Sequence, residues 1–146
     1  MKSLVFDYLP FPKRDPATRE IIDQVYYPFI PLRIIYKHQL YRNPVHCLLD
    51  SGSERNLLPA FLGEQMGIKV KKGKIQKILG IGGIVIEGFT HEVTFYLDTL
   101  SFKTEVDFSY EQEVPILGRT GFFDKFRKVI FKENEKIIEL EVNSKK

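Results

Sequence analysis

Short apolar segments, each bounded by turn residues, fill residues 32–142 and limit the chain to few folds. They are rich in Val, Ile, Phe and Tyr, which strands favour, and Gly, Pro, Asn and Asp separate them. Two stretches have the character of short helices instead: residues 59–66, which end at Gly67, and residues 120–126. The sequence therefore predicts a mostly β domain with one or two short helices.

Residues 1–31 have a different character. Prolines and aromatic residues recur there without a helical or strand period, as in YLPFPKRDP and YYPFIP. We interpret residues 1–31 as a lead-in arm and residues 32–146 as the folded domain. Within the arm, Asp15 and Pro16 favour a short helix over residues 17–23, because Asp caps free backbone N–H groups and Pro is tolerated in the first helical turn.

The composition is that of an ordinary globular domain. The 146 residues suffice to bury one core without disulfides or metal, and 43% hydrophobic and 28% charged residues exclude a disordered chain. The net charge of +3 gives only weak attraction for acidic partners, so we expect no nucleic-acid binding. The most basic run, residues 69–77, contains no aromatic residue on which a base could stack.

Cys47 is the only cysteine in the sequence. A single thiol forms no intramolecular disulfide and no cysteine-rich metal site, which fits a reducing compartment, and we expect a cytoplasmic protein. Asp7, Pro10 and Pro12 interrupt the apolar residues at the N-terminus, and no stretch reaches the ~20 apolar residues that span a bilayer. We therefore expect neither a secretory leader nor a membrane segment.

One aspartate stands at the end of a segment that reads as a buried strand. Apolar residues run directly into Asp50, Ser51, Gly52 and Ser53. A buried carboxylate is costly unless it is paired, hydrogen-bonded or protonated. Gly52 allows a sharp turn directly after the aspartate, and the hydroxyl of Ser51 can hold that turn. This position suits a catalytic carboxylate.

Three segments, taken in order, resemble the retropepsin-like, or retroviral-type, aspartic peptidases. LLDSGSERNLLP, residues 48–59, matches the family motif of two apolar residues, Asp, Thr or Ser, Gly, and Ala or Ser. KILGIGGIVIEGF, residues 77–89, is similar to the family's glycine-rich flap hairpin, and VPILGRTGFF, residues 114–123, is similar to the segment before its terminal helix. The three together are far more specific than any one alone.

The resemblance implies a closed β-barrel of the acid-protease type with a single lobe per chain. In that family two such aspartates meet, share one proton and hold the catalytic water, so that they titrate as a pair. This chain carries the motif once, because Asp98 and Thr99 are followed by Leu100 and not by glycine. The resemblance therefore implies an aspartic endopeptidase that hydrolyses peptide bonds as a homodimer, with Asp50 supplied by each chain.

The resemblance also implies roles for residues around Asp50. Glu54 and Arg119 occupy positions that commonly form an ion pair in the family, so we expect them to pair and to brace the loop. The residues expected to support the loop are Ser51, which replaces the commoner Thr, with Gly52, Ser53, Glu54, Gly118 and Arg119. The residues expected to form the flap over the substrate are Gly80, Ile81, Gly82, Gly83 and Ile84. No cofactor and no metal are implied.

Other motifs are less specific. GIGGIV lacks the last glycine of a G-x-G-x-x-G phosphate loop, because Val85 stands there and strand-like residues follow. His38, His46 and His91 could be metal ligands or bases, but no acidic or cysteine cluster has ligand spacing. The alternative to a peptidase is a non-catalytic member of the same fold that acts as a dimerisation or peptide-binding module.

Overall fold

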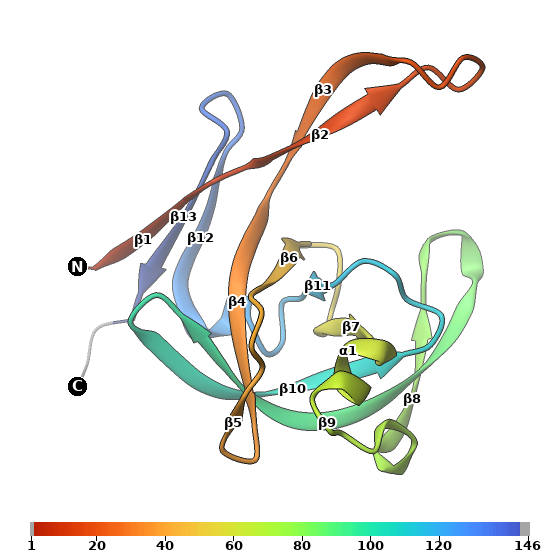
Figure 1. Cartoon of the computed structure of the whole chain (residues 1–146). Helices are drawn as coiled ribbons and strands as arrows, with labels where there is room; N and C mark the ends of the chain where they lie inside the picture. The colour runs from red at the N-terminus through yellow and green to blue at the C-terminus, as the bar shows by residue number, and fades with distance from the viewer. Residues whose placement is uncertain (1, 144–146) are drawn as a thin grey trace.

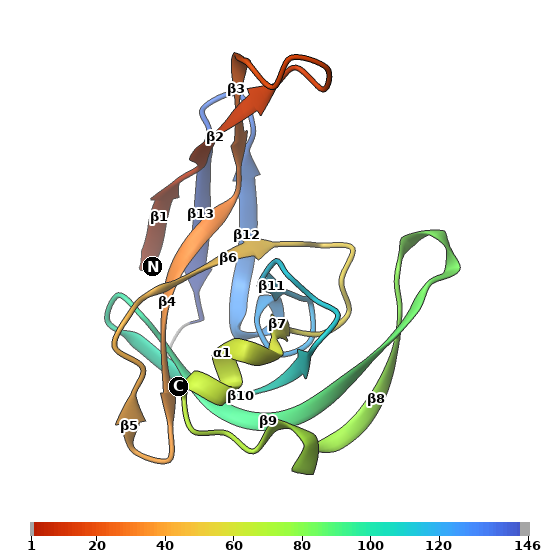
Figure 2. The ribbon, with the colours of Figure 1, turned by 45° about the vertical axis from the view of Figure 1, so that its right-hand side comes forward.

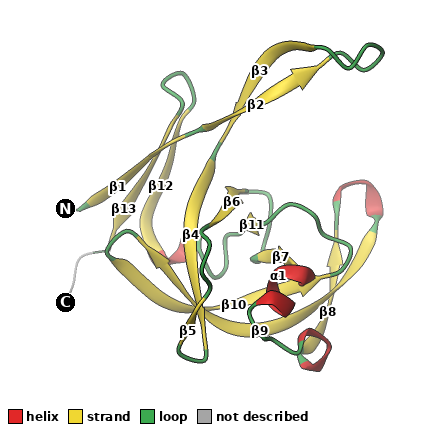
Figure 3. Cartoon of the chain, in the orientation of Figure 1, coloured by secondary structure: helices red, strands yellow, loops and turns green. Residues whose placement is uncertain are grey.

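The computed structural model describes residues 2–143 of the chain. Its strands are β1 (Ser3–Asp7), β2 (Leu9–Arg14), β3 (Ile21–Tyr27), β4 (Phe29–Tyr36), β5 (Gln39–Leu40), β6 (Val45–Leu49), β7 (Leu57–Pro59), β8 (Lys74–Leu79), β9 (Val85–Leu97), β10 (Leu100–Ser109), β11 (Ile116–Leu117), β12 (Phe126–Lys132) and β13 (Ile137–Val142). Helix α1 (Ala60–Gln65) and the single-turn helices η1 (Val70–Lys72), η2 (Ile81–Gly83) and η3 (Phe123–Lys125) lie between them. The chain is mostly β, as predicted (Figure 3).

Six of these strands close into a barrel. They are hydrogen-bonded in the order β4–β6–β11–β7–β10–β9, and β9 pairs with β4 again through Ile34 and Phe95. The β6–β11 and β7–β10 pairs are parallel, while β4 and β9 bind their neighbours in antiparallel fashion. Strands β5 and β8 extend the barrel sheet at its two ends. The predicted closed barrel with one lobe per chain is confirmed (Figure 1).

The core fills the barrel with alternate residues of its strands. In β4, Ile30, Leu32 and Ile34 are fully buried, whereas the residues between them face outward. Phe95 of β9 and Phe122, from the segment after β11, pack inside with their rings 6.4 Å apart. Complete burial of each large apolar side chain contributes about 1.5–3 kcal/mol, so this period-two pattern fixes which way each strand faces.

The helices follow local sequence signals. Helix α1 covers most of the predicted 59–66 stretch, and Gly67 follows it with a backbone φ of +83°, the left-handed conformation that favours glycine at a helix end. The prediction of this helix is confirmed. The second predicted helix, over residues 120–126, is reduced to the single turn η3, because Phe126 already starts strand β12.

Residues 3–31 form three strands and the start of a fourth, and not an irregular arm. Strand β1 pairs with β13, and β13 pairs with β12, in a sheet of its own. Strands β2 and β3 form an antiparallel hairpin that stands away from the barrel in both views (Figures 1 and 2). The predicted helix over residues 17–23 is wrong: Asp15 Oδ1 accepts the N–H groups of Ala17 and Thr18, which closes the hairpin turn, and strand β3 begins at Ile21.

Within residues 2–143, none of the helices has the length and apolar content needed to cross a membrane.

Candidate active site

Asp50 directly follows strand β6 of the barrel. Leu49, the last residue of β6, is buried, and the Asp50 N–H donates to the carbonyl oxygen of Leu117 at 3.0 Å. Leu48 donates in the same way to Pro115 at 2.8 Å, so the parallel pairing of β6 with β11 continues up to the aspartate. Asp50 is partly buried, and these backbone hydrogen bonds fix its position.

The loop after β6, residues 50–56, turns back on the carboxylate and is called the Asp50 loop below. The Gly52 N–H donates to Asp50 Oδ1 at 2.9 Å, and the Ser53 N–H donates to the Asp50 carbonyl oxygen at 3.1 Å. A Cβ at position 52 would lie 3.2 Å from Asp50 Oδ1, so a side chain there would crowd the carboxylate, whereas glycine does not. The Ser53 hydroxyl donates to the Arg55 carbonyl oxygen at 2.8 Å, which holds the second half of the loop. The side chain of Ser51 is exposed.

The segment after β11 lies directly against the Asp50 loop. The Arg119 N–H donates to the carbonyl oxygen of Ser53 at 2.9 Å, and the Thr120 N–H donates to that of Glu54 at 2.7 Å. A Cβ on Gly118 would lie 2.5 Å from the carbonyl oxygen of Arg55, so only glycine fits at this crossing. The two sequence segments expected to meet at the site therefore do meet.

Asn56 holds the same crossing from inside the barrel. It is completely buried, its Oδ1 accepts the Gly118 N–H at 3.1 Å, and its Nδ2 donates to the carbonyl oxygen of Glu105 at 3.1 Å. A buried amide with all its groups bonded fixes the position of both partners. Sequence reasoning missed this residue, although a polar side chain directly before the buried residues Leu57 and Leu58 is a usable signal.

The expected ion pair between Glu54 and Arg119 is absent from the part of the chain that the structure describes. Both side chains are exposed, and the two residues contribute backbone hydrogen bonds instead. A different pair braces the loop: Arg55 Nε donates to Asp107 Oδ2 at 2.7 Å, and an Arg55 terminal nitrogen donates to Oδ1 at 3.0 Å. The bond to Asp107 raises the pKa of the Arg55 guanidinium above its ordinary value.

Asp107 accepts this pair at a fully buried position in β10. Its Oδ1 also accepts the Thr90 hydroxyl at 2.6 Å, so both oxygens of the carboxylate are bonded. The parallel register places Asp107 opposite Leu57, two residues beyond Arg55. No sequence motif surrounds Asp107. Its position between the apolar residues Val106 and Phe108 was the one sign that its carboxylate is buried and needs a partner.

The predicted flap is a hairpin between β8 and β9. Leu79 pairs with Val85, the Gly80 N–H donates to the Ile84 carbonyl oxygen at 2.7 Å, and the tip contains η2. Gly82 and Gly83 have φ of +85° and +79°, a conformation that side chains disfavour. Ile84 is 66% exposed, and the side chain of Ile81 lies outside the described part of the structure. The hairpin rises beside the barrel in green in Figure 1.

A cleft of about 450 Å³ separates the Asp50 loop from β8. Gly52, Ser53 and Glu54 line it on the side of the loop, residues 76–79 line it on the side of β8, and Arg119 lines it as well. The cleft therefore brings together four of the predicted loop residues, while Asp50 and the glycines of the flap tip lie beyond its lining. An extended peptide segment in such a cleft can bind to strand edges through its backbone.

Other chemistry finds less support in the described residues. No group of three or more His, Cys, Asp and Glu side chains gathers there in a way that could hold a metal ion. Cys47 is completely buried, and burial raises the pKa of its thiol, so no reactive thiolate forms at this position.

Solved structures similar to this chain include two proteases. EIAV protease complexed with the inhibitor HBY-793 has a TM-score of 0.50 and 25% sequence identity, and the match covers 64% of this chain and 82% of that one. A retropepsin-like aspartic protease from Rickettsia conorii has a TM-score of 0.57 and 11% identity, over 95% of this chain and 92% of that one. No family model matches the chain, and no curated protein matches it.

These similarities define the class of protein. The chain has the fold of the retropepsin-like aspartic proteases, and the resemblance inferred from its three motifs is confirmed. The Rickettsia protease matches nearly the whole chain, so the likeness is not limited to the barrel.

Proposed function

We propose that this protein is an aspartic endopeptidase that is active as a homodimer, with Asp50 of each chain in one shared site. The observation that carries the proposal is the position of Asp50: backbone hydrogen bonds fix it directly after β6, its Oδ1 accepts the Gly52 N–H, and the loop that follows it lines a cleft of about 450 Å³. Retropepsin-like proteases share this fold, which supports peptide bonds as the substrate.

The second carboxylate has to come from a second chain. The sequence contains one Asp-Ser-Gly, and Asp98, the nearest approach to another, lies in the tight turn between β9 and β10 with a φ of +53°. Asp107 is unsuited as well, because Arg55 and Thr90 occupy both of its oxygens. A two-fold axis close to Asp50 gives each protomer what it lacks, since an isologous interface brings identical residues together.

In the proposed dimer, the two Asp50 carboxylates share one proton, because two negative charges a few ångströms apart repel strongly. The ionised carboxylate takes a proton from a bound water while the water oxygen attacks the carbonyl carbon of the peptide. The protonated carboxylate gives its proton to the carbonyl oxygen. The carboxyl group that took the water's proton then gives it to the departing amine, the other carboxylate takes a proton from the diol, and the C–N bond breaks to leave a carboxylic acid and an amine.

The flap supplies the cover that this chemistry needs. Leu79, Ile84 and Val85 are exposed apolar residues near its tip, and they gain burial when a peptide lies beneath them. Closure also removes water from the carboxylates, which strengthens their electrostatic action on the substrate. We expect a preference for peptides with apolar side chains at the bond that is cut.

The test is peptide cleavage by wild-type protein and by Asp50→Asn, measured from acidic to neutral pH with a peptide library. We expect Asp50→Asn to lower the rate about a hundredfold or more, because it removes the shared acid and base, while the variant stays folded. The matched control is Asp98→Asn, the same chemical change in an exposed turn, which is expected to cleave like wild type. Equal rates for Asp50→Asn and wild type would refute the assignment.

A non-catalytic peptide-binding module is the second candidate. The cleft and the exposed apolar flap favour it, because both can bind a peptide whether or not two carboxylates meet. Wild-type protein that binds library peptides but leaves them intact at every pH would support this candidate over the peptidase.

A further inference from the structure

We propose that Ser109 and Glu111 are positioning residues that together hold the root of the β8–β9 hairpin at Glu87 and so set the point from which the proposed flap bends. The inference rests on the proposed function, because it concerns how the flap closes over a peptide. It adds which residues outside the hairpin prepare it for closure.

Towards the flap tip, strand β9 has a neighbouring strand on one side only. The last pair that β10 makes with β9 joins Phe108 to Phe89. Strand β10 ends at Ser109, whereas β9 extends as far as Val85 and has only β8 beside it there. The backbone groups along this edge of β9 therefore need partners other than a strand.

Side chains at the end of β10 and just after it replace the missing strand at one residue, Glu87. The Glu87 N–H donates to Glu111 Oε1 at 3.2 Å, and the Ser109 hydroxyl donates to the Glu87 carbonyl oxygen at 2.7 Å. The Glu111 N–H donates to Ser109 Oγ at 3.2 Å, which links the two residues. Both backbone groups of Glu87 are thus bonded, as they would be by a neighbouring strand. Ser109 and Glu111 are called the clamp below.

The hairpin changes from packed to free at the same residue. Gly88 and Phe89 are buried, and a Cβ on Gly88 would lie 2.8 Å from Ile78 Cδ1. Glu87 is partly buried, and residues 82–85 at the tip are exposed. Within the described residues, no hydrogen bond joins the backbone of residues 82–85 to a segment outside the hairpin. The clamp therefore lies at the boundary between the fixed and the free parts of the hairpin, where a hinge is expected.

The loop that carries Glu111 is itself held in place. Gln112 Nε2 donates to the carbonyl oxygen of Val114 at 2.7 Å, which closes the loop on itself. The ring of Tyr110 lies edge-on to that of Phe89, with 6.4 Å between the ring centroids. Because the loop is fixed at both ends, the clamp can resist movement of the hairpin root.

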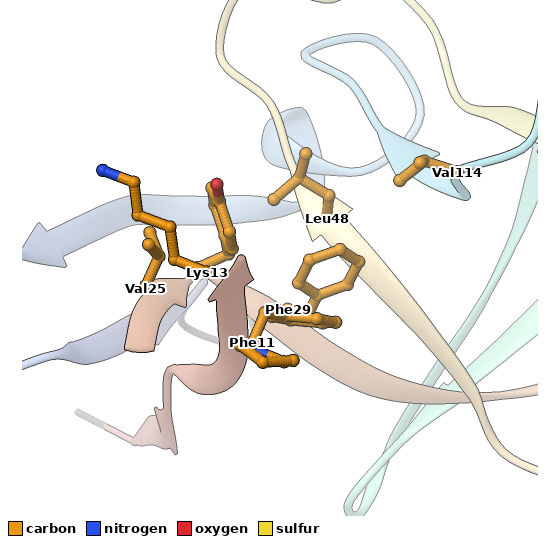
Figure 4. Close-up of a pocket in the computed structure, with 8 residues that line it drawn as sticks. Phe11, Lys13, Val25, Phe29, Leu48 and Val114 are labelled. Atoms are coloured by element: carbon orange, nitrogen blue, oxygen red, sulfur yellow. The ribbon is translucent and has the colours of Figure 1, made fainter. Parts of the chain in front are cut away.

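The same loop leads from the clamp to the strand that precedes Asp50. Val114 lines an apolar pocket of about 460 Å³ together with Phe29 and Leu48, as Figure 4 shows. The next residue, Pro115, accepts the Leu48 N–H at its carbonyl oxygen, two residues before Asp50. The clamp therefore ties the hairpin to the segment that also fixes the carboxylate.

A fixed root favours closure of the hairpin over a peptide. With a loose root the hairpin samples more conformations, and a smaller fraction of the molecules holds the tip where a peptide can bind. The apparent peptide affinity falls with that fraction, while Asp50 and the bonds around it are unchanged. Loss of the clamp is therefore expected to weaken peptide binding more than the chemical step.

Hydrogen exchange at the Glu87 amide tests the clamp directly, in the full chain and without a peptide. We expect Glu111→Ala to speed exchange at this amide about tenfold, because one hydrogen bond to a charged group is lost. Glu111→Gln keeps an oxygen acceptor and is expected to stay close to wild type. The matched control is Glu113→Ala: Glu113 is exposed on the same loop, its side chain forms no hydrogen bond or ion pair within residues 2–143, and its variant should exchange as wild type does.

The kinetic constants of peptide cleavage give the second measurement. For Glu111→Ala and for Ser109→Ala we expect KM to rise about tenfold and kcat to stay within about twofold of wild type. The double variant should add little to the larger single effect, since both side chains act on one residue. Circular dichroism verifies the fold, and the exposed Glu111 variants carry the test if Ser109→Ala, a buried substitution, does not fold.

The outcomes separate this inference from the proposed function. Unchanged exchange at Glu87 in Glu111→Ala, or an equal change in Glu113→Ala, would mean that the clamp does not hold the hairpin. Faster exchange with an unchanged KM would also overturn the inference, because the root would then have no part in closure. If wild-type protein binds library peptides without cleaving them, the peptidase is wrong, and the dissociation constant of a bound peptide takes the place of KM. Protein that neither binds nor cleaves peptides would overturn both.

Discussion

Asp107 links the Asp50 loop to the barrel wall at the scale of single residues. Its carboxylate is completely buried, and the two bonds from Arg55 and the one from Thr90 offset the loss of its hydration. Arg55 follows Glu54 in the loop, so the same pair that satisfies Asp107 also fixes the loop beside Asp50.

Arg55→Ala is predicted to lower the free energy of unfolding by about 2–3 kcal/mol, because it leaves a buried carboxylate without its charged partner. Urea denaturation measures the change. Lys77→Ala is the control, since its pair with Glu87 lies on the surface and its loss should cost less than about 1 kcal/mol. A stability of Arg55→Ala equal to that of Lys77→Ala would show that the buried pair does not brace the loop.

The residues of the site differ in how far they could be predicted. Asp50, Gly52 and Gly118 are marked by local patterns, because a buried strand followed by a tight glycine turn leaves a signature in consecutive residues. The partner of Asp107 depends on the register of β7 against β10, and a register between distant strands cannot be predicted from a few consecutive residues. The expected pairing of Glu54 with Arg119 failed for the same reason: their backbones meet, but the inward charge belongs to Arg55.

At the scale of elements, the β8–β9 hairpin, which we propose as the flap, depends on two glycines with left-handed backbones. Gly82 and Gly83 form the tip, and a Cβ at either position would meet no atom within 4 Å. A substitution there strains the backbone without a clash. The hairpin can therefore be perturbed without disturbing the core.

Gly83→Ala is predicted to lower kcat/KM by about tenfold, because a strained tip closes less accurately over the substrate. Its cost in stability is expected to be about 1 kcal/mol, the usual penalty for a side chain in this conformation. Gly67→Ala is the control: its φ of +83° and open surroundings are the same, but it follows helix α1. Peptide cleavage and urea denaturation of both variants separate flap function from backbone strain, and an equal loss of kcat/KM in the two would argue against a role for the flap.

Elements were predictable where turn residues and period-two burial coincide, as in β4, β6 and the β8–β9 hairpin. The β2–β3 hairpin escaped prediction because its burial pattern has no apolar face of its own: both strands are mostly exposed, and their prolines and aromatics obscure the alternation. The Asp15 side chain caps a turn as readily as a helix, so the local signal was real but belonged to the hairpin.

At the scale of the whole molecule, the single Asp-Ser-Gly favours the proposed arrangement of two chains about one site. The barrel fixes one such carboxylate per chain, directly after β6. The count of motifs favoured this arrangement from the sequence alone, whereas the contacts that fix Asp50 required the fold, because they come from β6, the loop after it and β11.

A mixing experiment tests the shared site most directly. Wild-type chains are combined with Asp50→Asn chains in equal amounts, at constant total concentration, and allowed to exchange before peptide cleavage is measured. Random pairing leaves two intact carboxylates in only about one quarter of the dimers, so the rate is predicted to be about one quarter of that of wild type alone. A rate of about one half would mean that each chain works with its own aspartate, and it would contradict a site built from two copies.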